Sequence, residues 1–332
     1  AKTVLMTGTA LCAAGVVLST AGYFAGGKDF TYTSDHMYVS GGNSSSRKNL
    51  TVMKKEQIDD FTKLNVDFDD FDLDIRTSDD DHYYMEYKLE KNGRKNPLTW
   101  KDKDGELTLE EPAGGSGSYY ITYDLGIFST HADLTETKDA LNTVILYIPE
   151  KAQLSEAELQ LSDGDLAADQ LLCKEMTLEL LNGDLMLDKG EFEKFDAKLS
   201  DGDLNVKELQ CTDNMQLKSG NGDVTIKKAE LADGQIALSD GDIQIDNSSF
   251  NGDMKINSSC GDVSVEMKNG SAEKTNIYLK TADGDVDTEG LSRGKTDNEE
   301  DTSVYENKAG ASAPTLNVEC SDGDITLTES EK

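Results

Sequence analysis

The sequence predicts an all-β fold: a single-stranded β-solenoid of the β-helix kind, with about 19–20 residues per coil, preceded by an N-terminal transmembrane helix. Three observations predict it. A Gly-Asp dipeptide recurs at a nearly fixed interval, apolar residues alternate on both sides of it, and 25 uncharged residues stand near the start of the chain. A period of this length is typical of solenoids, in which each coil buries its apolar face only by stacking on its neighbours.

The uncharged stretch runs from Thr3 to Gly27 and is rich in Ala, Val and Leu. It is long enough to span a bilayer, so residues 1–27 are interpreted as a membrane segment. A retained signal anchor and a cleaved signal peptide both fit its composition, and small residues such as Thr20 to Gly22 could form a cleavage site. Either alternative places most of the chain outside the membrane, with the membrane contacted through residues 3–27.

The next part of the chain divides into a linker and an irregular β region. Residues 28–57 are polar and predict a flexible linker. Residues 58–150 contain short alternating runs that predict strands less regular than those that follow. Asp104-Gly105-Glu106 resembles a degenerate corner of the repeat, 59 residues before Gly164.

Residues 151–332 carry the regular repeat, with an insertion at 292–314 that we expect to be a solvated loop. Positions −5, −3, +2 and +4 relative to each repeated Gly are mostly apolar, which predicts two short strands with one face inward. The corners lie between these strands. The repeated dipeptides begin at Gly164, Gly183, Gly202, Gly222, Gly241, Gly261, Gly284 and Gly323.

The Asp after each of these glycines predicts a vertical row of carboxylates along the solenoid. Unit charges at strand spacing, ~4.8 Å, repel one another by nearly 1 kcal/mol in water, so the row requires donors or cations that offset the repulsion. We favour N–H donors of each residue's own turn, since capping is the usual role of Asp in turns. The alternative is calcium shared between coils, for which the candidate ligands are Asp165, Asp184, Asp203, Asp223, Asp242 and Asp262.

Composition restricts the partners and the chemistry. The net charge of −33 argues against nucleic acid as a partner. Cys173, Cys211, Cys260 and Cys320 have neither the spacing of a zinc site nor that of a disulfide framework, so we expect buried free thiols. No motif of nucleophilic or metal catalysis is found, and we assign no catalytic, cofactor-binding or firm metal-binding residue.

A membrane segment, a strand-rich lead, a hydrophobic strand ending in Pro149 (VILYIP) and repeated Ser/Asn-x-Gly-Asp-Leu/Val/Ile corners resemble the DUF4097 family. The resemblance covers about residues 58–327. Members of this family are classed, by inference, as adhesins of bacterial cell envelopes. The resemblance implies a β-solenoid of a bacterial cell envelope without established catalytic residues. Together with the uncharged segment, it predicts a single-pass location on the bacterial cell membrane, with the bulk of the chain outside the cell.

The resulting functional hypothesis is a non-catalytic cell-surface solenoid that acts in adhesion or in envelope sensing and scaffolding, with an unidentified protein or glycan as its partner. Two alternatives stay open. One is a glycan-active enzyme of the β-helix type, for which a cleft with two carboxylates lined by aromatics such as Trp100 or Tyr119 would be the sign. The other is a calcium-binding surface protein.

Overall fold

The computed structural model describes residues 30–32, 37–39, 50–112, 141–288, 291, 294–299 and 302–331. The chain divides into two compact units. In the first, β1 (Phe30–Tyr32) and β2 (Met37–Val39) form an antiparallel pair, which lies in the segment predicted as a linker. The second unit contains residues 51–89, 96–112 and 138–332.

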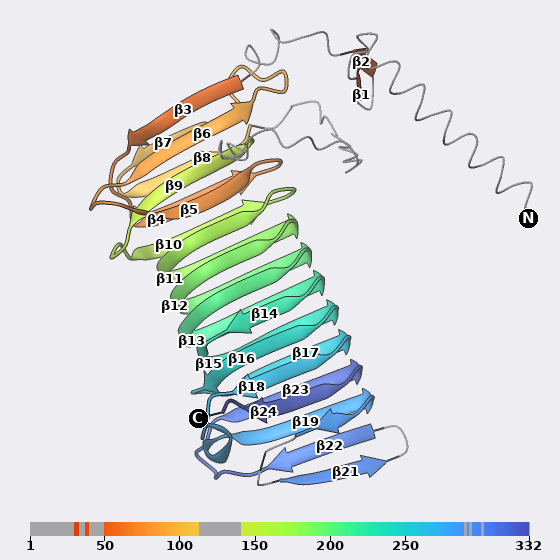
Figure 1. Ribbon diagram of the computed structural model, residues 1–332. Coiled ribbons are helices and arrows are strands. Elements are labelled where there is room, and N and C mark those ends of the chain that lie inside the picture. The colour runs from red at the N-terminus through yellow and green to blue at the C-terminus, as the bar shows by residue number, and fades with distance from the viewer. Residues whose placement is uncertain are drawn as a thin grey trace, which may run out of the picture. The chain divides into compact units, whose positions relative to one another are not determined.

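The remaining elements belong wholly or almost wholly to the second unit (Figure 1). The N-terminal group comprises β3 (Leu50–Gln57), β4 (Lys63–Phe68), β5 (Asp72–Ser78), β6 (Tyr84–Glu90), β7 (Thr99–Lys103), β8 (Glu106–Glu110) and β9 (Thr143–Pro149). The central group comprises β10 (Leu154–Leu161), β11 (Leu166–Asn182), β12 (Leu185–Asp201), β13 (Leu204–Asn221), β14 (Val224–Lys227), β15 (Ala229–Asp240), β16 (Ile243–Phe250), β17 (Met254–Cys260) and β18 (Val263–Met267). The C-terminal group comprises the 3₁₀ helix η2 (Ala272–Lys274), β19 (Asn276–Asp283), β20 (Val286–Asp287), β21 (Lys295–Glu299), β22 (Thr302–Asn307), β23 (Thr315–Asp322) and β24 (Ile325–Glu329).

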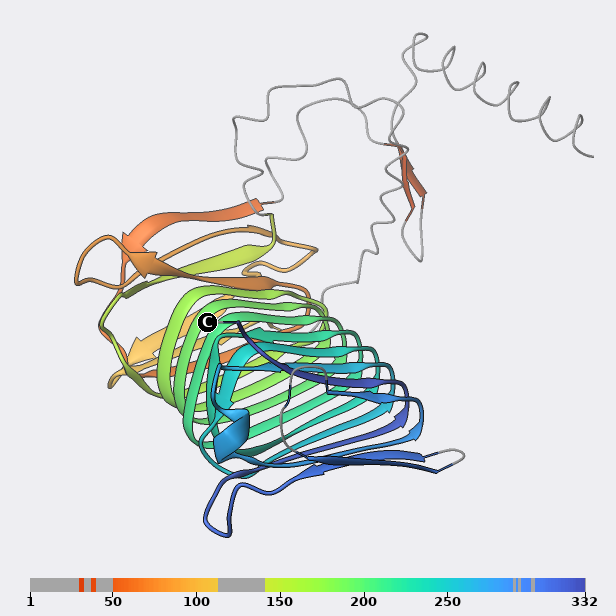
Figure 2. The same cartoon turned by 60° about the horizontal axis from the view of Figure 1, so that its bottom comes forward.

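The central strands stack in parallel, one coil upon the next, which confirms the predicted β-solenoid. Leu178 of β11 lies opposite Ala197 of β12, which lies opposite Leu217 of β13. The register advances by the sequence period, so equivalent positions of successive coils form straight rows. Figure 2 shows the coils nearly superimposed, with two walls that face each other across the interior.

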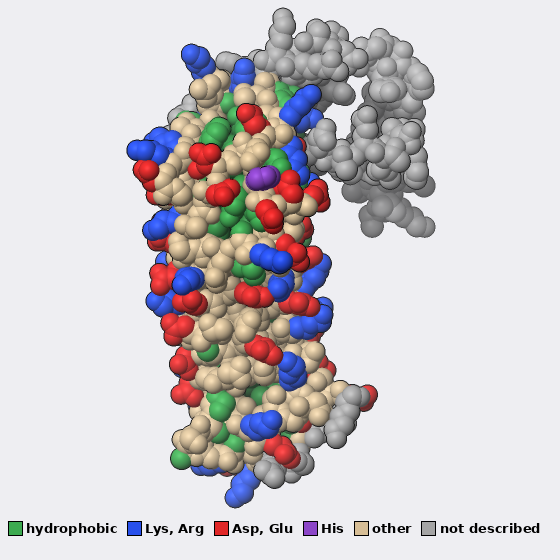
Figure 3. Space-filling model, turned by 90° about the vertical axis from the view of Figure 1, so that its left-hand side faces the viewer, with side chains coloured by type: hydrophobic (Ala, Val, Ile, Leu, Met, Phe, Trp, Pro, Cys, Tyr) green, Lys and Arg blue, Asp and Glu red, His purple; other side chains and the backbone are tan. Residues whose placement is uncertain are grey.

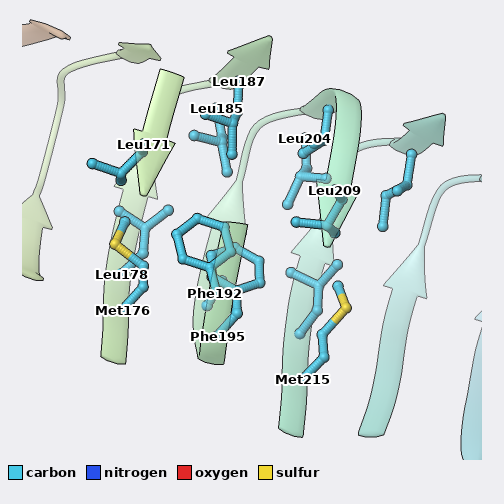
Figure 4. Close-up of a cluster of buried hydrophobic side chains, with 14 of the residues drawn as sticks. Leu171, Met176, Leu178, Leu185, Leu187, Phe192, Phe195, Leu204, Leu209 and Met215 are labelled. Atoms are coloured by element: carbon cyan, nitrogen blue, oxygen red, sulfur yellow. The ribbon is translucent and has the colours of Figure 1, made fainter. Parts of the chain in front are cut away.

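The interior is one continuous hydrophobic core. It extends from Ile58 to Leu327 and contains the inward positions of every coil. In the middle of the column, the Phe192 and Phe195 rings stack with centroids 5.0 Å apart, and leucine and methionine side chains of the neighbouring coils surround them (Figure 4). A solenoid of this period has no room for a separate core in each coil, so stability comes from contacts between coils.

The order of the coils in space differs from their order in the chain at both ends. At the N-terminal end, β4 and β5 lie between β8 and β9 on one side and β10 and β11 on the other. At the C-terminal end, β23 and β24 lie between β17 and β18 on one side and β19 and β20 on the other. The sequence spacing alone suggested a simple insertion between the last two corners.

Antiparallel strands close each end of the column. β6 pairs with β9 and β7 with β8 at one end, while β22 pairs with β19 and β21 with β22 at the other. Such caps cover strand edges that would otherwise be free to pair with other chains. The segment predicted as a solvated loop at 292–314 therefore contains a hairpin, and residues 50–57 of the predicted linker form β3.

Asp104-Gly105 is not a degenerate corner of the solenoid. Lys103 lies opposite Glu106 in the antiparallel β7–β8 pair, and Asp104 and Gly105 both have positive φ, 58° and 79°. This is a two-residue hairpin turn, for which Asp-Gly is a favoured sequence. The local sequence of this turn matches the repeat, but the two strands that it connects are antiparallel to each other.

Two further expectations concern the cysteines and the membrane. Cys173, Cys211 and Cys320 are free and buried as expected, whereas Cys260 is free but exposed because it lies in a corner next to Gly261. No helix in the described part of the chain is long and apolar enough to cross a membrane. The predicted membrane segment at residues 3–27 lies outside that part, as do residues 113–140, which include Tyr119.

Candidate functional site: the aspartate ladder

The Asp that follows each corner glycine forms a continuous ladder along the column. After the first member, Asp72, each backbone N–H in this row donates a hydrogen bond of 2.8 or 2.9 Å to the carboxylate Oδ1 of the Asp in the preceding coil. The order in space is Asp72, Asp165, Asp184, Asp203, Asp223, Asp242, Asp262, Asp324 and Asp285. All six predicted cation candidates lie in this one row.

These carboxylates bond to the next coil, which corrects the expectation that each one caps its own turn. The Asp203 carboxylate accepts its bond from the N–H of Asp223, twenty residues later in the chain. A hydrogen bond to a charged acceptor is stronger than one between neutral groups. The repeated bond therefore offsets part of the repulsion within the row and links neighbouring coils at the same time.

The glycine of each corner is required by close approach of the backbone. A Cβ on Gly202 would lie 2.1 Å from the carbonyl oxygen of Gly183, and the same contact with the preceding coil occurs at all eight corners. Positive φ is a second reason at six of them, including Gly202 at 137°, but not at Gly164 or Gly183. The close approach could not be predicted from the sequence, because the distance between stacked coils is not visible in one coil.

A second row of polar side chains runs beside the ladder, at the position before each glycine. Asn182 Nδ2 donates to Asp163 Oδ1 at 2.7 Å, and Asn221 Nδ2 donates to Asp201 Oδ1 at 2.6 Å. The alternation of Asp and Asn at this position thus supplies donor–acceptor pairs between coils. Hydrogen bonding in these two pairs accounts for the exchange of Asp and Asn at this position.

A shorter ladder that sequence analysis missed lies at another corner. The N–H of Asp253 donates to Asp233 Oδ1 at 2.7 Å, and the N–H of Thr315 donates to Asp253 Oδ1 at 2.8 Å. A Cβ on Gly252 would lie 2.4 Å from Asp233 Oδ1. The signal was present as the dipeptide Gly252-Asp253, which is out of phase with the main repeat and was therefore not counted.

Asp72 begins the ladder, and the pKa of its carboxyl is raised. Burial raises the pKa of its carboxyl above the ordinary value, and the nearby Asp165 charge adds to this, while hydrogen bonds from the Asp165 N–H and the Thr143 hydroxyl act in the opposite direction. Its corner contains Phe71 where the others contain glycine, and the Phe71 carbonyl lies against Gly164. The ladder thus extends one coil beyond the Gly-Asp motif.

The chemistry available to the ladder is hydrogen bonding and electrostatic attraction of cations. In the part of the chain that the structure describes, no three His, Cys, Asp or Glu side chains are grouped so as to hold a metal ion. The ladder carboxylates follow one another in single file along the column, and one oxygen of each accepts the bond from the next coil. Calcium bridging between coils stays a hypothesis, which a melting experiment described below tests.

The features expected of a glycan-active enzyme are not brought together by the described residues. Trp100 lies on β7 opposite Leu109 of β8, 38% exposed, at the N-terminal cap. A cavity of about 460 Å³ lies at the opposite end of the second unit, between β19, β22 and the segment after β22. It contains one carboxylate, Glu306, which pairs with Lys308 at 2.9 Å, so it lacks the carboxylate pair of a glycoside hydrolase.

A cluster on β3, β6 and β9, with Asp80 from the segment after β5, was not anticipated from the sequence. Lys55 Nζ lies 3.7 Å from the centroid of the Tyr147 ring and 5.0 Å from that of Tyr84. The Tyr147 hydroxyl donates to Glu86 at 2.6 Å, and the Tyr84 hydroxyl donates to Asp80 at 2.8 Å. The lysine therefore attaches the edge strand β3 to the outward side chains of its neighbours.

Stacked parallel coils, a common core and a ladder at the corners define the class of the protein as a β-solenoid repeat protein. The chain belongs to the Toastrack DUF4097 family, whose model matches residues 61–328. No curated protein matches the chain.

Three solved structures illustrate the similarity. A "putative adhesin" from Parabacteroides merdae is 16% identical, with a TM-score of 0.44 over 85% of this chain and 97% of that one. A "putative cell adhesion protein" from Clostridium sporogenes is 18% identical, with a TM-score of 0.22 over 84% and 100%. A "putative lipid binding protein" from Parabacteroides distasonis is 11% identical, with a TM-score of 0.41 over 85% and 97%.

Proposed function

We propose that this protein is a non-catalytic surface module of a bacterial cell envelope, which binds an extended protein or glycan along one wall of its solenoid. Its role would be adhesion or the sensing and scaffolding of the envelope. Residues 3–27 would attach it to the membrane as a single-pass segment or direct its export, with the bulk of the chain outside. The family and the hydropathy of that segment support the location.

The observation that carries the proposal is a polar wall formed by the strands that precede the corners. Its outward side chains stand in two straight rows, in register from coil to coil. One row is Thr177, Asp196, Gln216, Gln235 and Lys255, and the other is Glu179, Lys198, Lys218, Ala237 and Asn257. Hydrogen-bonding groups repeated at strand spacing suit a partner that is itself extended and repetitive.

The surface charge favours recognition by hydrogen bonds over non-specific attraction. Acidic and basic side chains are interspersed on the face that Figure 3 shows. Several lysines pair with carboxylates of an adjacent coil, as Lys194 does with Glu175 at 2.9 Å and Lys207 with Asp188 at 2.6 Å. Exposed pairs of this kind contribute little to stability, but they remove free positive charge that would attract polyanions.

Binding of the purified chain to peptidoglycan, teichoic acids, other glycans and host matrix proteins tests this proposal. For a partner on the polar wall, the double variant Gln216→Ala and Gln235→Ala should weaken binding by about tenfold, since each lost hydrogen bond costs about 0.5–1.5 kcal/mol. The matched control is Gln244→Ala, which removes an exposed glutamine from β16 on the other wall. Equal losses in both variants, or turnover of a glycan, would contradict the proposal.

A further inference from the structure

The coil formed by β23 and β24 lies between two coils that precede it in the chain. Leu316 of β23 lies opposite Met254 of β17 on one side and opposite Ile277 of β19 on the other. β24 is paired in the same way with β18 and β20. Figure 1 shows β23 and β24 between the β17–β18 coil and β19.

This inserted coil makes the full set of contacts between coils. The Asp324 N–H donates to Asp262, and the Asp324 carboxylate accepts from Asp285, each at 2.8 Å. Its inward side chains are completely buried: Leu316, Val318, Ile325 and Leu327. Without β23 and β24, the space between the two flanking coils would be a slot with an open hydrophobic core and four unpaired strand edges, those of β17, β18, β19 and β20.

The chain passes over the position of this slot before it returns to fill it. Residues 268–275, which include η2, connect β18 to β19. This connection skips the position in the column that the β23–β24 coil occupies. The β21–β22 hairpin and residues 308–314 then carry the chain back. The N-terminal end is different, because the coil of β4 and β5 comes before both neighbouring coils in the chain. The two later coils can therefore add to the two sides of a coil that is already in place.

The segment that leads into the slot, residues 308–314, is exposed or half-buried, and we call it the hinge. It is held mainly by Asn276, whose backbone N–H donates to the Pro314 carbonyl at 2.8 Å. Asn276 accepts hydrogen bonds from the N–H groups of Ala309 and Gly310 and donates to the carbonyls of Gly310 and Ala313. The cavity of about 460 Å³ lies against this hinge and is lined in part by Lys308, Gly310 and Ala311. Opening the hinge therefore sacrifices few contacts other than those with Asn276.

We propose that the slot binds the β23–β24 coil of a second copy of this chain, so that two copies exchange these coils reciprocally and form a dimer. The slot offers the same residues to either coil, and the pairing, the ladder bonds and the buried side chains are reproduced in the exchanged form. The monomer and the exchanged dimer differ in the conformation of the hinge. The population of the dimer rises with protein concentration. Exchange of an identical element between protomers is a low-cost route to a closed dimer.

A disulfide cross-link between two different full-length chains tests the exchange. The acceptor chain carries Cys12→Ser and retains Cys260, which is exposed and lies opposite Asp322 of β23. The donor chain carries Cys12→Ser, Cys260→Ser and Asp322→Cys. Paired residues of parallel strands have Cα atoms ~4.8 Å apart, within the range that a disulfide can bridge.

The two chains are unfolded, refolded together at high protein concentration and oxidised, and the linked heterodimer is identified by peptide mapping. We expect a disulfide between Cys260 of the acceptor and the thiol introduced at position 322 of the donor, with a yield that falls on dilution. Asn276→Ala in both chains should raise the yield, because it removes the four side-chain hydrogen bonds that hold the hinge.

The matched control is a donor with Cys12→Ser, Cys260→Ser and Asp240→Cys. Asp240 lies opposite position 260 on the other side, but its coil is not the one inserted into the slot. This control should give no heterodimer above the level of random collision. Equal yields from the two donors, or no heterodimer from either at any concentration, would overturn the proposal.

Discussion

Single residues at the corners set how closely the coils of this solenoid can stack. At Gly202 the carbonyl of the preceding coil occupies the place that a Cβ would take, 2.1 Å away. Each hydrogen bond of the ladder depends on that approach, since the Asp203 N–H reaches the Asp184 carboxylate of the same preceding coil at 2.9 Å. Replacement of a corner glycine should therefore disturb two coils at once.

Gly202→Ala should lower the free energy of unfolding by at least about 3 kcal/mol, since strain at φ 137° and a backbone clash act together. Gly270→Ala is the control for backbone strain alone: its φ is 75°, and a Cβ there would meet nothing within 4 Å. It should cost only about 1–2 kcal/mol. Denaturant unfolding of both variants measures the difference, and equal costs would show that close approach does not matter.

Asp72 predicts a dependence of stability on pH. Burial raises the pKa of its carboxyl in the folded state, so its stabilising contribution is complete below the unfolded pKa of about 3.9 and is lost as the pH rises through the folded value. Asp72→Asn keeps an oxygen that accepts the Asp165 N–H and removes the buried charge. The variant should melt at a higher temperature than the parent at pH 7, with a difference that disappears near pH 3. A difference that grows in acid would contradict this account.

At the scale of the strand and its corner, the ladder links corners of successive coils that are separate repeats in the sequence. Asp203→Asn retains an oxygen that can accept the Asp223 N–H and removes one of the aligned charges, so it should be nearly neutral. Asp203→Ala removes the acceptor and should cost about 1–2 kcal/mol. Thermal melting with and without millimolar calcium measures both variants.

The calcium arm of that experiment separates the two accounts of the ladder. Hydrogen bonding between coils predicts that calcium changes the melting temperature no more than sodium chloride of the same ionic strength does. Cation bridging predicts that calcium raises the melting temperature by mass action and that Asp203→Asn abolishes the rise. The second result would make the ladder a calcium site and would replace the hydrogen-bonding account.

The sequence predicted the regular elements well because their signals are local. Alternating apolar positions and a fixed period determine which side chains of β11, β12 and β13 point inward, and these strands agree with the expectation. The insertion of β23 depends on which coil its edge pairs with, and neighbouring coils offer nearly identical edges. Asp104-Gly105 was misread for the same reason, since one local sequence serves a parallel corner and an antiparallel hairpin.

The candidate site was predicted in its residues but not in its bonds. The spacing of Asp165 through Asp262 placed them in one row, and they lie in one row. The partner of each carboxylate belongs to another coil, 19 or 20 residues away for Asp165 through Asp242 and 62 residues away for Asp262, and no single repeat contains that information. The cluster of Lys55 with Tyr84 and Tyr147 joins three strands of an irregular region, where no period was available to guide the prediction.

At the scale of the whole molecule, charge opposes the compact state. The chain has a net charge of −33, and the ladder concentrates part of it in one row. Ion pairs between coils stabilise the compact state. Pairs such as Lys228 with Glu208 are exposed, however, and exposed pairs typically contribute about 0–1 kcal/mol each. Self-repulsion should therefore outweigh them in the response of the protein to salt.

Sodium chloride should accordingly raise the melting temperature, and the rise should continue well above physiological ionic strength. The Debye length is about 8 Å at 0.15 M, longer than the ~4.8 Å between ladder charges, so those neighbours are screened effectively only near 1 M, where it is about 3 Å. Melting in sodium chloride from 0.01 to 1 M measures this response, and Asp203→Asn should show a smaller rise because it carries one ladder charge fewer. A melting temperature that falls with salt would mean that the ion pairs between coils, and not self-repulsion, dominate the electrostatics of the fold.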